Sequence, residues 1–318
     1  MRALIFGISG QDGAYLAQLL LERGYEVWGA TRDAHRLDRE KLDALGITDR
    51  VRIISTILTD FRSVLSSLDT VAPDEIYNLA GQSSVSLSFE EPMETMNSMS
   101  SGTLHLLECI RYRSARTKLY NAGSGECFGE LKGTAADEQT AFRPRSPYGV
   151  AKAAAHWLVV NYRESYGIFA CNGILFNHES PLRPKRFVTR KVIAAVAAIA
   201  RGSNEKLRLG NTTIIRDWGW APEYVHAMWR ILQHESAEDF VIATGESHSL
   251  EEFVKTAFSC IGRDSAEFVE YDNHMLRPSE IMHSAANPGK AQRLLQWSAK
   301  NKMHDVVRLM LEAEEASG

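Results

Sequence analysis

The sequence predicts an α/β fold: a doubly wound parallel sheet with a smaller, interleaved domain towards the carboxyl terminus. The chain opens with a short apolar segment, residues 2–6, which runs into a glycine-rich turn and an amphipathic segment. Apolar segments typical of buried strands then alternate with helical patterns as far as Leu175. Beyond Leu175 the chain becomes loop-like and rich in hydrogen-bonding side chains. The alternation predicts the parallel sheet, and the change after Leu175 predicts the second domain.

Each expected element follows from its own pattern. Strands are expected where short apolar runs end in polar or small residues, and helices where apolar residues recur every three or four positions. Pro147 marks the start of one further helix, because proline fits the first turn of a helix and not its interior. The expected strands span residues 2–6, 25–30, 51–55, 74–81, 118–123, 168–175 and 239–243; the expected helices span 14–23, 61–70, 92–113, 187–200, 224–232, 250–261 and 303–313. We expect residues 1–176 and about 213–245 to form a nucleotide-binding domain, and residues 177–212 and 246–318 to form the smaller domain.

Charge and cysteine usage narrow the class of protein. The 318 residues carry a formal net charge of −4 with a pI of about 6.2, which does not suggest a nucleic-acid partner. The apolar runs fall well short of the ~18 residues that a membrane span requires, and the chain starts without the layout of a signal peptide. The four cysteines lie far apart in the sequence, which argues against a zinc site and a disulfide framework. We therefore expect a cytoplasmic protein that holds no metal.

The first turn has the spacing of a dinucleotide-binding loop. Gly7, Gly10 and Gly13 follow a strand and precede a helix, which is the context that such a loop needs. Glycines allow the tight turn and let a pyrophosphate approach the free N–H groups at the helix amino terminus. At the end of the second expected strand stand Arg32, suited to a ribose 2′-phosphate, and Asp33, suited to a 2′-hydroxyl. NADP and NAD therefore both remain open as the cofactor.

The chemistry is expected where the strand 118–123 ends. Side chains just past the carboxyl end of a strand face the ligand crevice of an open α/β sheet, which places Ser124 and Glu126 there. Tyr148 and Lys152 are four residues apart on the following helix and so share one face. An ammonium near a tyrosine favours the phenolate and lowers its pKa, so that the phenolate can take a proton from a hydroxyl.

Basic side chains in the second half of the chain are candidates to hold a diphosphate. Arginine presents a fork of donors that matches phosphate oxygens. The candidates are Arg183, Lys191, Arg216 and Arg277.

Taken together, these motifs resemble the GDP-mannose 4,6-dehydratase family of the extended short-chain dehydrogenases/reductases, over nearly the whole chain. The run Asn177-His178-Glu179-Ser180-Pro181 distinguishes that family from other sugar-nucleotide dehydratases. The other matching motifs lie at residues 7–13, 75–79, 144–149, 172–176, 187–191, 209–211, 216–219 and 277–280. The resemblance implies a Rossmann sheet, an NADP cofactor, a GDP-sugar substrate and a homodimer or homotetramer.

The resemblance also implies a role for each site residue. Tyr148 would be the base at the sugar O4, Lys152 would hold the cofactor ribose and tune Tyr148, and Ser124 would hydrogen-bond O4. Glu126 would remove the C5 proton and return it to the departing C6 hydroxyl. The implied cofactor contacts are Gly7, Gly10, Gln11, Asp12, Gly13, Arg32, Leu58, Leu79, Ala80, Gln82, Ser83, Tyr148, Lys152, His178 and Arg183; the implied GDP contacts are Asn177, Lys191, Arg216, Arg277 and Glu280.

Several positions depart from the family pattern. Arg32-Asp33 replaces an Arg-Arg pair, the loop after it is shorter, and Ile57 stands where the family has an aspartate beside the adenine. The shorter loop leaves both the NADP preference and the tetramer open. GDP-manno-heptose or a GDP-hexosamine would suit the same machinery. A related GDP-4-keto-sugar reductase or epimerase is disfavoured by Glu126, and a non-catalytic NADP(H)-sensing protein is disfavoured by the presence of Tyr148 and Lys152.

Overall fold

A seven-stranded parallel sheet forms the centre of the larger part of the molecule. The computed structural model describes residues 1–113, 116–275 and 277–316. The strand order is β11-β6-β5-β4-β1-β2-β3, and every neighbouring pair is parallel. This arrangement confirms the predicted doubly wound sheet. The strands are β1 (Arg2–Phe6), β2 (Glu26–Thr31), β3 (Arg52–Ser55), β4 (Glu75–Asn78), β5 (Lys118–Ser124), β6 (Ala170–Leu175) and β11 (Phe240–Ile242).

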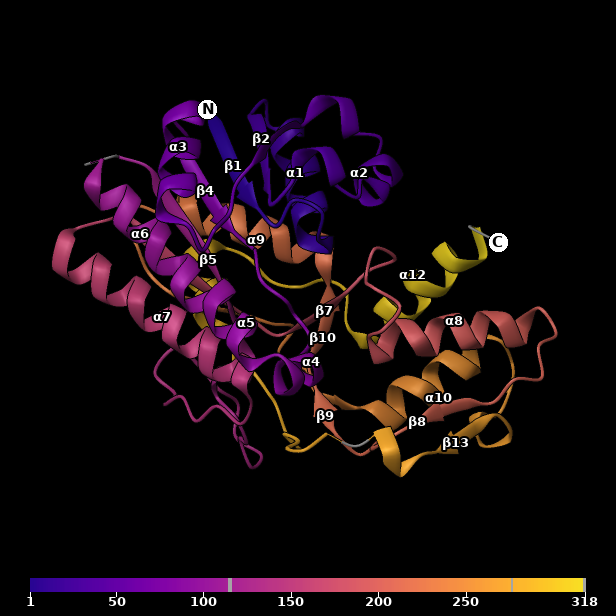
Figure 1. The fold of residues 1–318 in the computed structure, drawn as a ribbon. Coiled ribbons are helices and arrows are strands. Elements are labelled where there is room, and N and C mark those ends of the chain that lie inside the picture. Colours follow the sequence, from indigo (N-terminus) through magenta and orange to yellow (C-terminus); the bar gives the residue numbers. More distant parts are fainter. Residues whose placement is uncertain (114–115, 276, 317–318) are drawn as a thin grey trace.

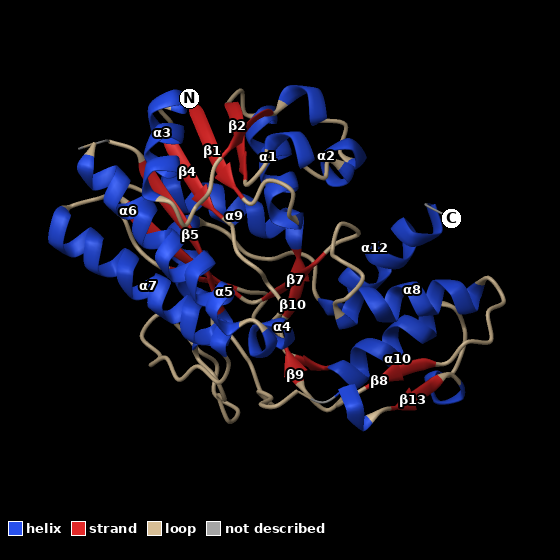
Figure 2. Cartoon of the chain, viewed as in Figure 1, coloured by secondary structure: helices blue, strands red, loops and turns tan. Residues whose placement is uncertain are grey.

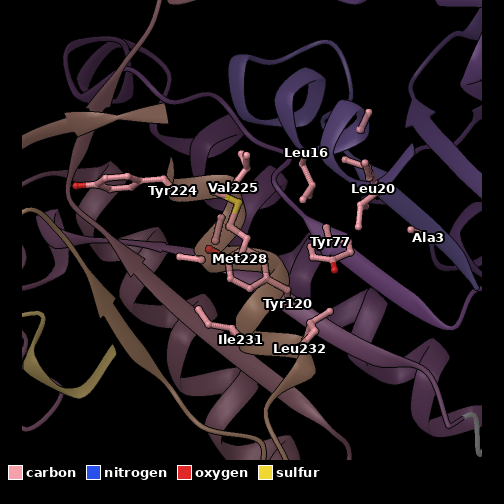
Figure 3. Close-up of a cluster of buried hydrophobic side chains, with 14 of the residues drawn as sticks. Ala3, Leu16, Leu20, Tyr77, Tyr120, Tyr224, Val225, Met228, Ile231 and Leu232 are labelled. Carbon is pink, nitrogen blue, oxygen red and sulfur yellow. The ribbon is translucent and has the colours of Figure 1, made fainter. Parts of the chain in front are cut away.

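Helices cover both faces of this sheet (Figure 2). Both faces of strand β1 carry apolar side chains that need to be covered. Ala3 and Ile5 belong to one buried cluster, and Leu4 and Phe6 belong to another on the opposite face. The first cluster includes Leu16 and other side chains of α1 together with side chains of α9, and Figure 3 shows how they gather. One face carries α1 (Gln11–Glu22), α9 (Ala221–Gln233), α2 (Glu40–Ala44) and α11 (Gly289–Leu295); the other carries α3 (Phe61–Val71), α6 (Gly102–Tyr112) and α7 (Pro147–Tyr166).

Three asparagines join the strands beneath the edge where the site residues lie. The strand register aligns Asn78, Asn121 and Asn172 on β4, β5 and β6. Nδ2 of Asn78 donates to Oδ1 of Asn121 at 3.0 Å, and Nδ2 of Asn121 donates to Oδ1 of Asn172 at 2.9 Å. Buried polar groups with partners of this kind rigidify the region around them.

A smaller lobe lies beside the sheet (Figure 1). Its separate core contains Val196, Phe253, Phe258, Val307 and Met310, all buried. The lobe is built from α8 (Val188–Ala200), β8 (Leu207–Leu209), α10 (Leu250–Cys260), β13 (Val269–Tyr271) and α12 (Met303–Ala316). Two short strand pairs stand between the lobe and the sheet: β7 (Asn177–Glu179) with β10 (Trp218–Trp220), and β9 (Ile215–Arg216) with β12 (His248–Ser249).

The structure also corrects parts of the sequence-based segmentation. The expected helix 92–113 is interrupted: α5 (Pro92–Met96) passes through a π-helical turn, Asn97–Ser101, before α6 begins. The short helix α4 (Val85–Glu90) was not expected, nor were α2, α11 and the pairing of the short strands. In the part of the chain that the structure describes, no helix combines the length and apolar character that crossing a bilayer demands.

Candidate active site

The glycine loop is shaped for close contact between backbone segments. Gly7 adopts a φ of 88°, and a Cβ atom there would lie 2.8 Å from the Leu79 carbonyl oxygen. A Cβ atom on Gly13 would lie 2.3 Å from the carbonyl oxygen of Gly7, so the first turn of α1 packs directly on the loop. Gly10 is the N-cap of α1 and supplies no side-chain cap. The loop therefore presents uncapped N–H groups of a helix amino terminus, as a bound pyrophosphate requires.

The first turn of α1 is tied to the loop that follows β6. Oδ2 of Asp12 lies 2.9 Å from Nε2 of His178, and Nε2 of Gln11 donates to the His178 carbonyl oxygen at 3.2 Å. The Ser180 hydroxyl donates to Oε1 of Gln11 at 2.7 Å. The His178 ring stacks on Tyr224, with 4.6 Å between ring centroids. Residues from the two halves of the chain thus meet at the glycine loop.

Asp12 and His178 form an ion pair. Burial disfavours both charges, but His178, a hydrogen bond from Gln11 and the Arg183 charge together lower the pKa of the Asp12 carboxyl below its usual 3.8. Burial likewise opposes the imidazolium, but Asp12 outweighs it and raises the pKa of His178 above 6.5. The carboxylate at the helix amino terminus is therefore partly neutralised before any anion binds there.

The remaining implied cofactor contacts surround this loop. Leu79 donates its N–H to the Phe6 carbonyl at the end of β1, and Ala80 follows it. The Gln82 side chain donates to Thr95 and accepts the Ser84 N–H, which shapes the loop between β4 and α4. Three implied contacts remain. Leu58 fills the space that Gly102 leaves open, and Ser83 is exposed. Arg183 pairs with Glu179 and lies over the Phe187 ring.

Arg32 and Asp33 lie at the end of β2, and both are exposed. Oδ1 of Asp33 accepts the His35 N–H at 2.9 Å and so caps the 3₁₀ turn Ala34–Arg36. Nε of Arg36 lies 3.8 Å from Oδ2 of Asp33. The Asp33 carboxylate therefore already has partners within its own turn.

Ser124, Tyr148 and Lys152 meet where β5 ends and α7 begins. The hydroxyl of Ser146 accepts the Gly149 N–H at 3.0 Å and caps α7, which sets the position of Tyr148 in its first turn. Nζ of Lys152 donates to the Ala122 carbonyl at 2.7 Å and lies 5.9 Å from the centroid of the Tyr148 ring. The prediction that Tyr148 and Lys152 lie on one face of the same helix is confirmed.

Burial has the largest effect on the pKa of Tyr148 in this structure. Burial raises the pKa of the Tyr148 phenol above 10.0, and a hydrogen bond with Ser124 opposes that shift only in part. Lys152 is itself buried, its ammonium is held by a backbone carbonyl, and burial lowers its pKa from 10.5 to about 8. Desolvation outweighs the attraction because both groups are enclosed by protein.

Glu126 lies in a 3₁₀ turn, Gly125–Cys127, directly after β5. Its N–H donates to the Ser124 hydroxyl at 3.2 Å, so the two residues are held in a fixed relation. Burial raises the pKa of Glu126 above 4.5, although Arg216 and Arg277 act in the opposite direction. A carboxyl with a raised pKa can both take and return a proton near neutral pH.

The positive side of this region comes from Arg216 on β9 and from Arg277. Nη2 of Arg216, a buried side chain on β9, lies 3.0 Å from Oε1 of Glu280. Arg277 approaches the same oxygen at 3.3 Å, and its Nε donates to the Ser86 hydroxyl on α4 at 3.2 Å. The structure thus brings Glu126, Arg216, Arg277 and Glu280 together.

The two other implied GDP contacts have partners of their own. Asn177 pairs with Trp218 in the strand register, and Nζ of Lys191 donates to the Arg208 carbonyl at 2.6 Å. Ser86 was missed from the sequence because α4 was not recognised. The available signal was Ser84, whose hydroxyl caps α4 by accepting the Leu87 N–H.

Comparison with known proteins agrees with this arrangement. The family model for GDP-mannose 4,6 dehydratase matches residues 4–310. The chain is 44% identical to GDP-mannose 4,6 dehydratase 2 of Arabidopsis thaliana over 98% of this chain and 86% of the relative, and 43% identical to GDP-mannose 4,6 dehydratase of Dictyostelium discoideum over 97% and 94%. A crystal structure of the Thermus thermophilus UDP-glucose 4-epimerase complex with NAD matches the fold with a TM-score of 0.86 at 24% identity, covering 100% of both chains. The chain therefore belongs to the GDP-mannose 4,6-dehydratase family.

Proposed function

We propose that this protein is a GDP-mannose 4,6-dehydratase that converts GDP-mannose to GDP-4-keto-6-deoxymannose and recycles its nicotinamide cofactor within each turnover. The observation that carries the proposal is the position of Glu126 between the Ser124–Tyr148 pair and the Arg216–Arg277 cluster. Both curated relatives carry the name of this activity. A carboxyl in that place distinguishes dehydration from simple oxidation or epimerisation at C4.

The glycine cradle fits a dinucleotide. The loop from Gly7 to Gly13 would hold the pyrophosphate, and its tight turn needs glycine at both ends because a Cβ atom there would collide with the backbone. The bound nicotinamide would supply the place where a hydride from the sugar C4 is stored and from which it returns to C6. Lys152 would bind the cofactor ribose and orient it toward Tyr148.

The side chains of this chain perform the proton transfers. Tyr148 takes the O4 proton, which needs a positive charge nearby because burial alone keeps the phenol protonated. The resulting C4 ketone acidifies C5, and Glu126 removes the C5 proton. Glu126 then gives that proton to the C6 hydroxyl, which leaves as water, and Tyr148 returns its proton to C5. Both side chains end as they began, and the sugar has lost one water.

The deciding experiment is incubation with GDP-mannose and sub-stoichiometric NADP⁺. We expect a keto-sugar nucleotide lighter by one water, formed in excess over the cofactor and without net NADPH absorbance. Accumulation of NADPH in step with product would indicate an ordinary dehydrogenase, and no product would overturn the proposal. A parallel incubation with GDP-manno-heptose and a GDP-hexosamine tests the alternative substrates of the same reaction.

We further propose NADP rather than NAD as the cofactor. Asp33 caps its own turn and so is not poised for a ribose 2′-hydroxyl, whereas Arg32 is exposed beside it. Tighter binding of NADPH than of NADH, with the difference lost in Arg32→Ala, supports this assignment. Equal affinity for both in the native protein would contradict it.

We also propose a homodimer built on α6 and α7. Val150 and Trp157 are seven residues apart on one face of α7 and are 44% and 58% exposed, and Tyr112 on α6 is 73% exposed. Light scattering of Trp157→Lys should give a monomer where the native protein gives a dimer. A native monomer, or a tetramer unaffected by this change, would contradict the arrangement.

We also propose how the chain is divided into domains and in which compartment the protein is found. The smaller lobe has a buried core separate from those on the two faces of the sheet, which supports a division into a cofactor domain, residues 1–176 and about 213–245, and a sugar-nucleotide domain, residues 177–212 and 246–318, with α11 of the second segment packed back on the sheet. All four cysteines are free thiols, which favours the cytoplasm.

A further inference from the structure

An isoleucine is exposed at the carboxyl end of β3. The side chain of Ile57 is 48% exposed, although its backbone N–H is held by the Ser63 hydroxyl of α3 at 2.9 Å. The neighbouring Leu58 is partly buried, and its carbonyl oxygen lies 3.0 Å from Nδ1 of His105 on α6. The main chain is therefore anchored on both sides while the Ile57 side chain remains open to solvent.

The strand order places Ile57 at one end of the dinucleotide crevice. A dinucleotide lies outside the carboxyl ends of the strands, with its pyrophosphate at the glycine loop after β1 and a ribose at the end of β2. In the observed order β3 is the neighbour of β2 on the side away from β1. The base attached to that ribose therefore extends towards the end of β3, where Ile57 lies.

The first carboxylates that follow β2 and β3 are engaged in their own turns. The first acids after β2 and β3 are Asp33 and Asp60. Oδ1 of Asp33 accepts the His35 N–H, and Oδ1 of Asp60 accepts the Arg62 N–H, each at 2.9 Å. Each carboxylate thus caps the helical turn that follows it. The exposed side chain of Ile57 is aliphatic and has no hydrogen-bond acceptor.

We propose that Ile57 makes the cofactor site indifferent to the group at position 6 of the purine base. The base packs on the isoleucine side chain, and no carboxylate reads its 6-amino group. A site built to hydrogen-bond a polar group rejects an analogue that lacks it, whereas an apolar contact discriminates weakly. This inference rests on the proposed function, because it assumes a nicotinamide dinucleotide cofactor.

The test compares NADPH with its hypoxanthine analogue, which carries a 6-oxo group in place of the 6-amino group. Nicotinamide fluorescence reports binding of both without any turnover. We expect the two Kd values of the native protein to agree within about threefold, because only apolar contact is involved. In Ile57→Asp, NADPH should bind at least about tenfold more tightly than the analogue, because the new carboxylate accepts from an amino group and repels a carbonyl.

Two further variants make the result specific. Ile57→Leu keeps an aliphatic side chain of equal size, and its two Kd values should again agree. Asp60→Asn keeps the cap, since asparagine caps helices as well as aspartate does. A native preference for NADPH of more than about tenfold would overturn the inference, and its loss in Asp60→Asn would assign the discrimination to Asp60.

The outcome also separates this inference from the proposed function. If both dinucleotides bind and the native protein prefers the 6-amino form, only the inference fails. If NADPH and NADH, together with their analogues, all fail to bind, the proposed function fails and the inference fails with it.

Discussion

Oδ2 of Asp12 lies 2.9 Å from Nε2 of His178, although 166 positions separate the two residues in the chain. The contact joins the glycine loop to the segment that leads into the smaller lobe. His178 also stacks on Tyr224 and is only 8% exposed, so its charge is poorly solvated. The free energy of unfolding should therefore depend on whether the two side chains of this pair are charged.

The first prediction concerns pH and stability. The folded pKa of His178 lies above its unfolded value of 6.5, so its contribution is complete below pH 6.5 and is lost as the pH rises through the raised pKa. The folded pKa of Asp12 lies below 3.8, so its contribution is present above pH 3.8 and is lost as the pH falls through the lowered pKa. Thermal melts of His178→Gln should lack the loss of Tm that the native protein shows as the pH rises from 6.5 through the raised pKa. Identical pH profiles for the two proteins would refute the ion pair.

The second prediction concerns Glu126. Glu126→Gln removes the group that moves the C5 proton but keeps the shape of the side chain. We expect kcat to fall by roughly 10²–10⁴-fold, the usual contribution of a general acid–base group. Affinity for GDP-mannose, measured by calorimetry, should change little. The matched control Glu164→Gln, on an exposed position of α7, should leave both quantities unchanged; normal dehydration by Glu126→Gln would remove the assigned role.

The third prediction concerns Lys152 and alkaline pH. The pKa of Lys152 is about 8, so its ammonium is lost as the pH rises through that value. Since Tyr148 is buried and needs nearby positive charge to lose its proton, kcat/KM should decline above about pH 8. Lys152→Arg keeps its charge in that range, so its residual activity should decline only at higher pH. If kcat/KM declined over the same alkaline pH range in both proteins, the decline would be due to a group other than Lys152.

The fourth prediction concerns the glycine loop. A Cβ atom on Gly13 would lie 2.3 Å from the Gly7 carbonyl oxygen, whereas one on Gly10 would lie 3.1 Å from the same atom. Gly13→Ala must therefore move the backbone, and we expect it to weaken NADPH binding by at least about tenfold, or ~1.4 kcal/mol. Gly10→Ala should have a clearly smaller effect in the same fluorescence titration. Equal affinities in the two variants would contradict the packing described for α1.

The fifth prediction concerns Arg216. Arg216→Gln removes a buried guanidinium and leaves Glu280 without its 3.0 Å partner. We expect the KM for the GDP-sugar to rise roughly ten- to a hundredfold, as for loss of a hydrogen bond to a charged group. NADPH binding should be unaffected. Arg208→Gln, whose side chain is 65% exposed on β8, serves as the control and should leave KM unchanged.

Local sequence patterns were sufficient for the main elements of the fold. The seven predicted strands all occur, and the doubly wound order follows from their alternation with helices. Boundaries moved where loops are tight: α1 begins at Gln11 rather than at residue 14, because Gly7 and Gly10 complete the turn within four residues of β1. Helix α4 escaped notice because six residues are too few to show helical periodicity.

Local patterns predicted one part of the candidate site and missed another. The spacing of Tyr148 and Lys152 was enough to place both on one face of α7, since four residues span about one helical turn. The contact of Ser86 with Arg277 spans 191 positions, and no local pattern reports such a distance.

The sequence by itself determined the sheet, the glycine loop and the residue types available for catalysis, because these depend on patterns within a few neighbouring residues. Only the tertiary structure decided the protonation of those residues. Burial raises the pKa of Tyr148 and Glu126 and lowers that of Lys152, and burial is created by segments that meet only when the chain has folded.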